Sequence, residues 1–397
     1  MPEFVVEPDR VATGGNALGR APDGRVVFVD GALPGERVRV EVTAGHKKRL
    51  EARTVEVLRP AAARRVAPCA AVSAGCGGCD WQHAQPDHQR ELRRAVVEDC
   101  LRRLARIEHP PVVLGPELPA DRYRTTVRAA VHRGRAGYRG RRSHEVVHGG
   151  SCLVAHPLVE ELLVDGRFGS AEEVVLRCGA RTGERLALVT PTAEGVRLPD
   201  DVLVVGADEV AAGHPAAHHE EIAGRRLRIS ARSFFQCRPD GAEALIELVA
   251  AALGGSVGAA DEGPLLDAYG GVGLFGAVLG RDRPVIGVES SPSSSADALV
   301  NYASGAEVHR RRVEEWNPVP VAAVIADPAR AGLGKRAAAR LAATGAPVLA
   351  LVSCDPASLA RDAALLDGHG YALTSVTTVD LFAQTSHVEA VSRFERR

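Results

Sequence analysis

One cysteine occupies a position from which a nucleophile could act. Cys354 lies in Ser353-Cys354-Asp355-Pro356, directly after the apolar run at 347–352. Such a run predicts a buried strand, and open α/β sheets carry their chemistry at the carboxyl ends of strands. A thiolate at this edge could attack an electron-poor carbon, whereas the alternative is an inert thiol buried at the strand end. What it would attack depends on the ligand beside it.

A glycine-rich turn upstream could hold that ligand. The segment 271–276 matches G-x-G-x-x-G after the apolar run at 265–269, and glycines permit a tight turn close to a ligand. Glu289 ends the next predicted strand, where a carboxylate can accept hydrogen bonds from ribose hydroxyls. Both NAD(P) and S-adenosylmethionine (SAM) fit this pattern. The Asp327-Pro328 strand end with a thiol downstream, and the C-terminal place of the domain, favour SAM.

A methyl donor beside a thiol indicates methylation of a pyrimidine at C5. C5 of uracil is a poor nucleophile, but addition of a thiolate to C6 turns the ring into an enolate whose C5 can take the methyl group. A base must then remove the C5 proton so that the thiol can leave. Glu389, in His387-Val388-Glu389 at the start of the last predicted strand, is the candidate base. Taken alone, a carboxylate at such a place is more commonly a surface group.

Three further cysteines stand close together: Cys69, Cys76 and Cys79, the last two separated by two glycines. The glycines permit the chain to wrap around a metal, and Cys152 is the candidate fourth ligand. Four thiolates hold either a [4Fe–4S] cluster or a structural zinc, and the sequence alone does not choose between them. Scattered, unliganded thiols are the alternative, which the C-x2-C spacing disfavours in a reduced compartment.

The elements around these residues predict three domains. Residues 1–60 carry short strands and predict an OB-like β-barrel, a common platform for single-stranded nucleic acid, with a purely structural or docking role as the alternative. Residues 61–230 mix strands and helices and include the cysteine cluster and a helix at 86–107. Residues 231–397 predict an α/β catalytic domain with a doubly wound, Rossmann-like sheet.

The catalytic domain alternates strands with helices and closes with an antiparallel pair. Its strands are expected at 265–269, 284–289, 322–326 and 347–352, with a helix at 358–366. The tail at 372–394 contains two strand-like stretches with no helix between them, which predicts the antiparallel pair.

Charge and composition bear on partners and location. The net charge of −1 does not indicate a nucleic-acid partner, but residues 122–144 hold eight arginines and no acidic residue, and 46–49 form a second basic cluster. These runs predict a polyanion-binding surface, with plain solvated surface as the alternative. No apolar run reaches transmembrane length and the first residues lack a secretory signal, so the expected location is the cytoplasm, where cysteines stay reduced.

Taken together, these motifs resemble the RNA uracil-5 methyltransferase family, in particular its iron–sulfur branch with an N-terminal TRAM domain. The resemblance runs along nearly the whole chain. Its elements are Pro34-Gly35-Glu36, the four cysteines, Phe234-Phe235-Gln236, Asp267-Ala268-Tyr269, Glu289, Asp327-Pro328-Ala329-Arg330, Ser353-Cys354-Asp355-Pro356 and Thr385-Ser386-His387-Val388-Glu389.

The resemblance implies a SAM site, a nucleophile and a base. Cys354 would be the nucleophile and Glu389 the proton acceptor, and the four cysteines would hold [4Fe–4S] rather than zinc. The implied substrate is a uridine of RNA, with 23S ribosomal RNA favoured and the tRNA T-loop as the alternative. Neither a membrane nor an obligate protein partner is expected. The implied SAM-binding residues are Gln236, Tyr269, Glu289 and Asp327.

The chain departs from the family pattern without losing a group that the mechanism requires. Gly270 stands where cysteine is usual, Arg238 and Asp355 where asparagine is usual, Leu274 where a small polar residue is common, and Ala329 where a second proline is usual. These departures bear on SAM affinity and on the choice of RNA.

Two other functions share some of these sequence features. A radical-SAM enzyme that modifies RNA also combines cluster cysteines with a TRAM domain, but its C-x3-C-x2-C spacing is missing and the glycine loop does not suit it. A catalytically idle RNA-binding protein is the rival from another class. The presence of both Cys354 and Glu389 disfavours it.

Overall fold

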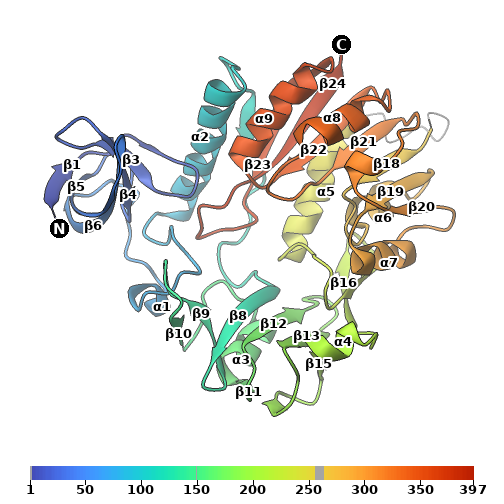
Figure 1. Cartoon of the computed structure of the whole chain (residues 1–397), viewed down its shortest axis with the longest axis horizontal. Coiled ribbons are helices and arrows are strands. Elements are labelled where there is room, and N and C mark those ends of the chain that lie inside the picture. Colours follow the sequence, from blue (N-terminus) through green and yellow to red (C-terminus); the bar gives the residue numbers. More distant parts are fainter. Residues whose placement is uncertain (1, 149, 255–262) are drawn as a thin grey trace.

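The computed structural model describes residues 2–148, 150–254 and 263–397, and its elements fall into three parts along the chain (Figure 1). The N-terminal strands form a lobe of their own at the left of Figure 1. The central part lies below, and the C-terminal α/β part lies above it.

The N-terminal part is a six-stranded sheet with the strand order β1-β5-β6-β4-β3-β2. Along β5, Val38, Val40 and Val42 are buried and alternate with charged residues, because successive side chains of a strand point to opposite faces. The last strand is the longest of the six and pairs with both β4 and β5. The strands are β1 (Glu3–Val6), β2 (Arg10–Val11), β3 (Ala17–Arg20), β4 (Val26–Asp30), β5 (Arg37–Gly45) and β6 (Arg49–Arg59).

The central part contains a second six-stranded sheet, ordered β10-β9-β8-β12-β13-β15, with α3 (Pro157–Asp165) packed on one face. Its strands are β8 (Thr126–His132), β9 (Arg135–Arg139), β10 (Val146–Val147), β12 (Glu173–Cys178), β13 (Arg185–Thr190) and β15 (Val202–Gly206). The short elements around it are α1 (Ala70–Ser73), β11 (Arg167–Phe168), β14 (Val196–Arg197), α4 (Ala207–Ala211), β16 (Ala217–Ile222) and β17 (Arg225–Ser230).

The C-terminal part is an eight-stranded mixed sheet, ordered β20-β19-β18-β21-β22-β24-β23-β7. Its first five strands are parallel, and β24 runs antiparallel to both of its neighbours. The predicted α/β class and the antiparallel closing pair are therefore confirmed. The strands are β18 (Leu265–Ala268), β19 (Val285–Glu289), β20 (Glu307–Arg310), β21 (Ala323–Ala326), β22 (Val348–Ser353), β23 (Tyr371–Val379) and β24 (Glu389–Arg396).

Helices cover both faces of this sheet, as a doubly wound fold requires. One face is packed by α5 (Pro239–Leu253), α6 (Leu274–Leu279) and α7 (Pro292–Asn301), and the other by α8 (Gly334–Ala342) and α9 (Pro356–Asp367), with the 3-10 turn η3 (Val313–Glu315) beside α8. No helix in the described ranges is long and apolar enough to cross a membrane.

Two elements from the middle of the chain complete the C-terminal part. The helix predicted at 86–107 is α2 (Pro86–Leu104), and it ends early because Arg106 takes a φ of 61°. Its buried residues Val97 and Leu101 join the apolar core formed by α8 and α9. The strand β7 (Val112–Leu114) then pairs with β23 at the edge of the sheet. This segment therefore packs on the catalytic sheet, although the sequence assigned it to the central domain.

Candidate active site and cysteine cavity

The carboxyl ends of β18, β19, β21 and β22 open onto one cavity, which encloses about 1780 Å³ of space continuous with solvent. Parallel strands meet at the same edge, so side chains that follow them converge there. The segment between β17 and α5 and the start of β24 close the cavity. All six residues predicted for catalysis and SAM binding line it: Gln236, Tyr269, Glu289, Asp327, Cys354 and Glu389.

The glycine turn is built over a buried tyrosine. Tyr302 donates its hydroxyl hydrogen to Asp267 at 2.9 Å, and Asp267 also accepts from the Gly276 N–H at 2.8 Å. A Cβ at Gly273 or Gly276 would lie 2.5 Å from the Tyr302 ring. Of the three glycines in the motif, only Gly271, with a φ of 57° and open space beside it, faces the cavity.

The same ring accounts for the departure at Gly270. A Cβ there would lie 2.8 Å from the Tyr302 hydroxyl oxygen, closer than real Cβ contacts come. The usual cysteine therefore has no room while Tyr302 donates to Asp267. Buried Tyr302 occupies the space that the side chain would need.

Glu289 is oriented by backbone groups at the end of β19. Its carboxylate accepts hydrogen bonds from the Gly271 N–H at 3.0 Å and the Ser291 N–H at 2.6 Å. These bonds tie the carboxylate to the glycine turn and to the turn before α7. A ligand lying on the glycine turn would thus meet a fixed acceptor.

Cys354 sits between the end of β22 and the start of α9. Asp355 caps that helix by accepting the Ser358 N–H at 2.7 Å, and Pro356 begins it. An aspartate in place of the family's asparagine therefore keeps the capping role. Burial, and then the nearby carboxylates of Glu389 and Asp327, raise the pKa of the Cys354 thiol to about 11.

The two carboxyl groups beside the thiol also hold protons more tightly than usual. Burial, and then the charge of Asp267, raise the pKa of Asp327 to about 7. Burial, and then Asp327, raise the pKa of Glu389 well above its ordinary value. The guanidinium of Arg330 lowers the pKa of both Cys354 and Glu389. Burial therefore raises the pKa of all three groups, and the charge of Arg330 partly opposes this for Cys354 and Glu389.

The loop between β23 and β24 adds groups to which the sequence assigned no role. Phe382 and His387 both line the cavity, and their rings meet edge to face with centroids 5.8 Å apart. His387 Nδ1 lies 3.5 Å from Arg330 Nη2. Both His387 and Arg330 lie within motifs that carry the family resemblance. Those motifs are the sequence feature from which a role for these residues could have been predicted. Phe234, between β17 and α5, also lines the cavity without an assigned role, and it is 68% exposed.

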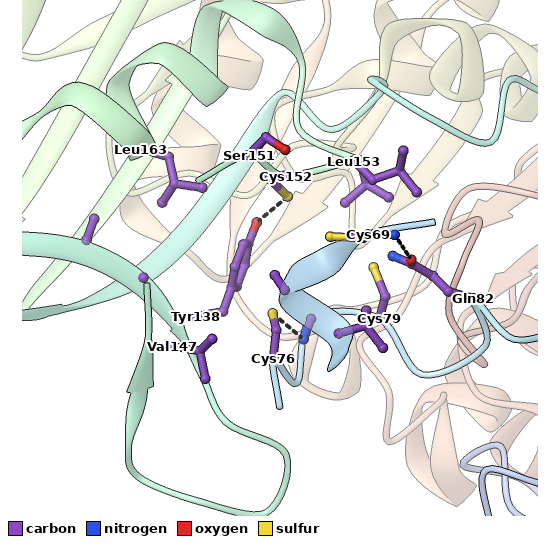
Figure 2. Close-up of a pocket in the computed structure, with 16 residues that line it drawn as sticks. Cys69, Cys76, Cys79, Gln82, Tyr138, Val147, Ser151, Cys152, Leu153 and Leu163 are labelled. Atoms are coloured by element: carbon purple, nitrogen blue, oxygen red, sulfur yellow. Dashed lines mark hydrogen bonds between the residues drawn. The ribbon is translucent and has the colours of Figure 1, made fainter. Parts of the chain in front are cut away.

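The four cysteines predicted as metal ligands line a second cavity, of about 530 Å³ (Figure 2). Cys69, Cys76 and Cys79 come from the segment around α1, and Cys152 comes from the far side, beside Tyr138. Cys76 accepts the Gly78 N–H at 3.4 Å, and the Cys152 thiol donates to the Tyr138 hydroxyl at 3.8 Å.

The four thiols share this cavity but do not form a recognisable metal-binding group. Across the described residues, no three His, Cys, Asp or Glu side chains are placed to hold a metal ion. Burial is the main cause that raises the pKa of Cys76, and it raises the pKa of Cys79 to about 12. The structure does not show the predicted metal site.

The basic run is partly neutralised by carboxylates. Arg141 pairs with Asp30 at 2.9 Å and Arg142 with Glu51 at 3.6 Å, which ties the run to the N-terminal sheet. Arg128 pairs with Glu173 at 2.7 Å. Residues 122–144 contain no acidic residue, but in the folded protein carboxylates from other parts of the chain lie beside three of their arginines. Lys47 and Lys48, at the turn between β5 and β6, remain exposed.

Comparisons with known proteins agree with this architecture. Residues 6–55 match the TRAM domain. The chain is 36% identical to an uncharacterized RNA methyltransferase of Streptomyces avermitilis, over 99% of this chain and 98% of that protein. It is 33% identical to one of Corynebacterium glutamicum, over 98% and 96%. The Pyrococcus abyssi tRNA (uracil-54, C5)-methyltransferase in complex with S-adenosyl-L-homocysteine has a similar fold, with a TM-score of 0.73, 23% identity and coverage of 98% and 99%.

Proposed function

Because this chain belongs to the RNA methyltransferase family, we propose that it transfers a methyl group from SAM to C5 of a uridine in RNA. One observation carries the proposal. The thiol of Cys354, the carboxyl of Glu389 and the glycine turn share a single cavity at the edge of the sheet. That set matches the needs of C5 chemistry: a nucleophile for C6, a base for C5 and a place for a methyl donor.

The proposed reaction divides the work among residues of this chain. The Cys354 thiolate adds to C6, so electron density moves to C5. SAM, when bound, would supply the electrophilic methyl group: the C5–CH3 bond forms as the sulfonium S–CH3 bond breaks, and S-adenosylhomocysteine is the leaving group. The Glu389 carboxylate then removes the C5 proton, the C5–C6 double bond re-forms and the bond between C6 and Cys354 breaks. Arg330 favours both reactive anions, since its charge lowers the pKa of each group.

The residues that would hold SAM suit a cationic ligand. Glu289 presents a carboxylate fixed by two backbone N–H groups, in the place where ribose hydroxyls would bind. Asp327, with Tyr269 and Gln236 in the same wall, offers a carboxyl whose ionised form a sulfonium charge would stabilise. The proposed cofactor residues are therefore Gln236, Tyr269, Glu289 and Asp327.

The proposed RNA is 23S ribosomal RNA, and the alternative is the tRNA T-loop uridine, on which the Pyrococcus abyssi protein acts by its name. A flipped base would enter the cavity beside Cys354. Mapping 5-methyluridine in ribosomal and transfer RNA from cells with and without the gene identifies the target. A uridine that loses its methyl group only in the deletion strain is the substrate.

The nucleophile is tested by replacing it. Cys354→Ala should abolish methyl transfer while SAM binding stays within a few-fold of the unmodified protein, because Cys354 is not among the proposed SAM-binding residues. The measurements are transfer of a tritiated methyl group to bulk RNA and calorimetric titration with SAM. Methylation that persists in this variant would refute the role of Cys354.

We also propose that the four cysteines hold a [4Fe–4S] cluster. The donor set is all sulfur and lies in one cavity, as either a cluster or zinc requires, and the resemblance to the iron–sulfur branch favours the cluster. Protein purified without oxygen should contain iron and acid-labile sulfide, and Cys79→Ser should lose both. Stoichiometric zinc in place of iron would contradict the proposal.

A further inference from the structure

The loop at 380–388, which joins β23 to β24, has no regular structure, yet most of it is buried. It presents Phe382 and His387 to the reaction cavity and leads directly into Glu389. Because no strand or helix holds it, its position must be set by groups outside it. Those groups come from α2, whose Gln89 and Arg93 bind the loop, and from the residues that directly follow the cysteines in the chain.

Gln384 is the strained point of the loop, with a φ of 68°. Its backbone O accepts the Trp81 N–H at 3.0 Å, and its N–H donates to Gln89 Oε1 at 2.8 Å. Its side-chain oxygen accepts from Arg65 Nη2 at 2.8 Å. A strained backbone persists only where its surroundings over-determine it, and such strain gathers at active sites.

Asp80 makes the second attachment, two residues further along the loop. Its Oδ1 accepts the Ser386 N–H at 2.7 Å, and its Oδ2 accepts the Ser386 hydroxyl at 2.6 Å. Asp80 directly follows Cys79 in the chain. Gly15 of the N-terminal sheet covers the pair, since a Cβ there would lie 2.6 Å from Ser386 Cβ and 2.9 Å from Asp80 Oδ2.

We propose that Asp80 is a positioning residue for the reaction: through its two hydrogen bonds to Ser386, it fixes the chain three residues before Glu389 and places His387 in the cavity wall. This inference rests on the proposed function. Asp80 acts on the side of the site that removes the C5 proton. Cys354 stands on a different element, at the end of β22, so its attack on C6 should depend less on this contact than proton removal by Glu389 does.

Attack on C6 and removal of the C5 proton can be measured separately. A general loss of folded protein would slow both, whereas a displaced Glu389 should slow mainly the second. RNA containing 5-fluorouridine carries fluorine where the C5 proton stands, so the adduct with Cys354 forms and takes up the methyl group but is not released. Its formation reports the nucleophile side alone. Turnover on ordinary RNA also requires proton removal.

Asp80→Ala should lower turnover on ordinary RNA roughly 10- to 100-fold, as expected for a reacting group displaced by about an ångström. Adduct formation on 5-fluorouridine RNA should change less than about threefold, since the displaced group is not used in that step. Asp80→Asn should restore turnover, because its amide oxygen accepts the Ser386 N–H and its NH2 group donates to the Ser386 hydroxyl. Equal losses in both assays, or an Asp80→Asn variant as slow as Asp80→Ala, would overturn the proposal.

A matched control and a double-mutant cycle complete the experiment. Glu91→Ala removes an exposed carboxylate of α2 that pairs with Arg94 and lines neither cavity, so both rates should be retained. Ser386→Ala should add nothing in the Asp80→Ala background, because the two residues act as one unit. Additive effects would contradict the proposal. If the unmodified protein forms neither adduct nor 5-methyluridine, the proposed function itself fails.

Discussion

At the scale of single residues, the reaction cavity places a thiol between two carboxyl groups, Asp327 and Glu389. Each of the three has a raised pKa because burial penalises its charged form. A sulfonium ligand would bring a positive charge into this cluster and favour the anions. Binding of the cofactor would then also favour ionisation of the thiol and the two carboxyl groups.

The affinity for SAM should depend on the ionisation of Asp327. The pKa of this carboxyl is about 7, so it is neutral below that pH and attracts a cation only above it. Affinity should therefore rise as pH increases from 5.5 to about 7, by up to about tenfold per pH unit, and then level off. Calorimetric titration across pH measures this.

Asp327→Asn is the control for that pH dependence. The variant should bind SAM more weakly at pH 8, and the rise with pH should disappear. Because SAM itself titrates in both proteins, the difference between the two curves isolates the carboxyl. A variant that keeps the full pH dependence would assign it to another group.

Glu389→Gln should separate the two halves of the reaction. A glutamine cannot accept the C5 proton, so the adduct between Cys354 and RNA should accumulate after methyl transfer. The adduct is measured as a protein band shifted by bound RNA in a denaturing gel. Absence of any adduct, with SAM binding intact, would argue against Glu389 as the base.

At the scale of elements, the glycine turn and Tyr302 form one packing unit. Gly270, Gly273, Gly276 and Gly287 each lie against the tyrosine ring or its hydroxyl. The glycines are therefore needed for contact with a protein side chain as much as for access to a ligand. Sequence pattern alone could not distinguish these two reasons, because both demand the absence of a Cβ.

Gly270→Cys should destabilise the turn. Its Cβ would meet the Tyr302 hydroxyl at 2.8 Å, and overpacking of this kind costs about 1–3 kcal/mol. Thermal unfolding should begin at lower temperature, and SAM affinity should fall. Tyr302→Phe removes the hydroxyl oxygen and should recover part of both losses in the double variant. Equal stability of the single and double variants would show that the contact is not responsible.

The sequence predicted best the elements whose burial is evident from the hydrophobic pattern of neighbouring residues. The four parallel strands that were predicted begin and end within one residue of their predicted bounds, because an apolar run between turns is buried on both faces. The fifth, β20 at the edge of the sheet, was not predicted. The convergence of six site residues followed, since most of them end or follow such strands. Two kinds of feature could not be predicted from the sequence. β7 has only three residues, too few to show a strand pattern. The residues that bind loop 380–388 lie about 300 positions away in the chain, so no local pattern connects them to it.

At the scale of the whole molecule, ion pairs join the basic run to the N-terminal lobe. Arg141 and Arg142 contact Asp30 and Glu51, so these two arginines hold the parts together as well as adding positive charge. The exposed turn at Lys47 and Lys48 is freer to meet phosphate groups. The chain has one further lysine, Lys335, which stands on α8.

Replacing Lys47 and Lys48 with alanine should weaken RNA binding roughly tenfold at low salt. It should also reduce the slope of log affinity against log salt by up to about 1.4, because each phosphate contact on a single strand contributes about 0.7. SAM affinity should not change. Lys335→Ala is the matched control and should leave both properties unchanged. An unaltered salt slope in the double variant would place the phosphate contacts elsewhere.

The eight-stranded sheet combines elements from distant parts of the chain, which affects the order in which its parts are synthesised and the choice of fragments that can fold. Its outer strand, β7, and the covering helix α2 are synthesised long before β23 and α9, against which they pack. A gene fragment that begins at residue 231 would leave β23 as a bare edge and α9 without cover, and its product should aggregate. Joining residues 86–115 to that fragment through a flexible linker should restore solubility. For engineering purposes, the transplantable catalytic module is discontinuous in the gene.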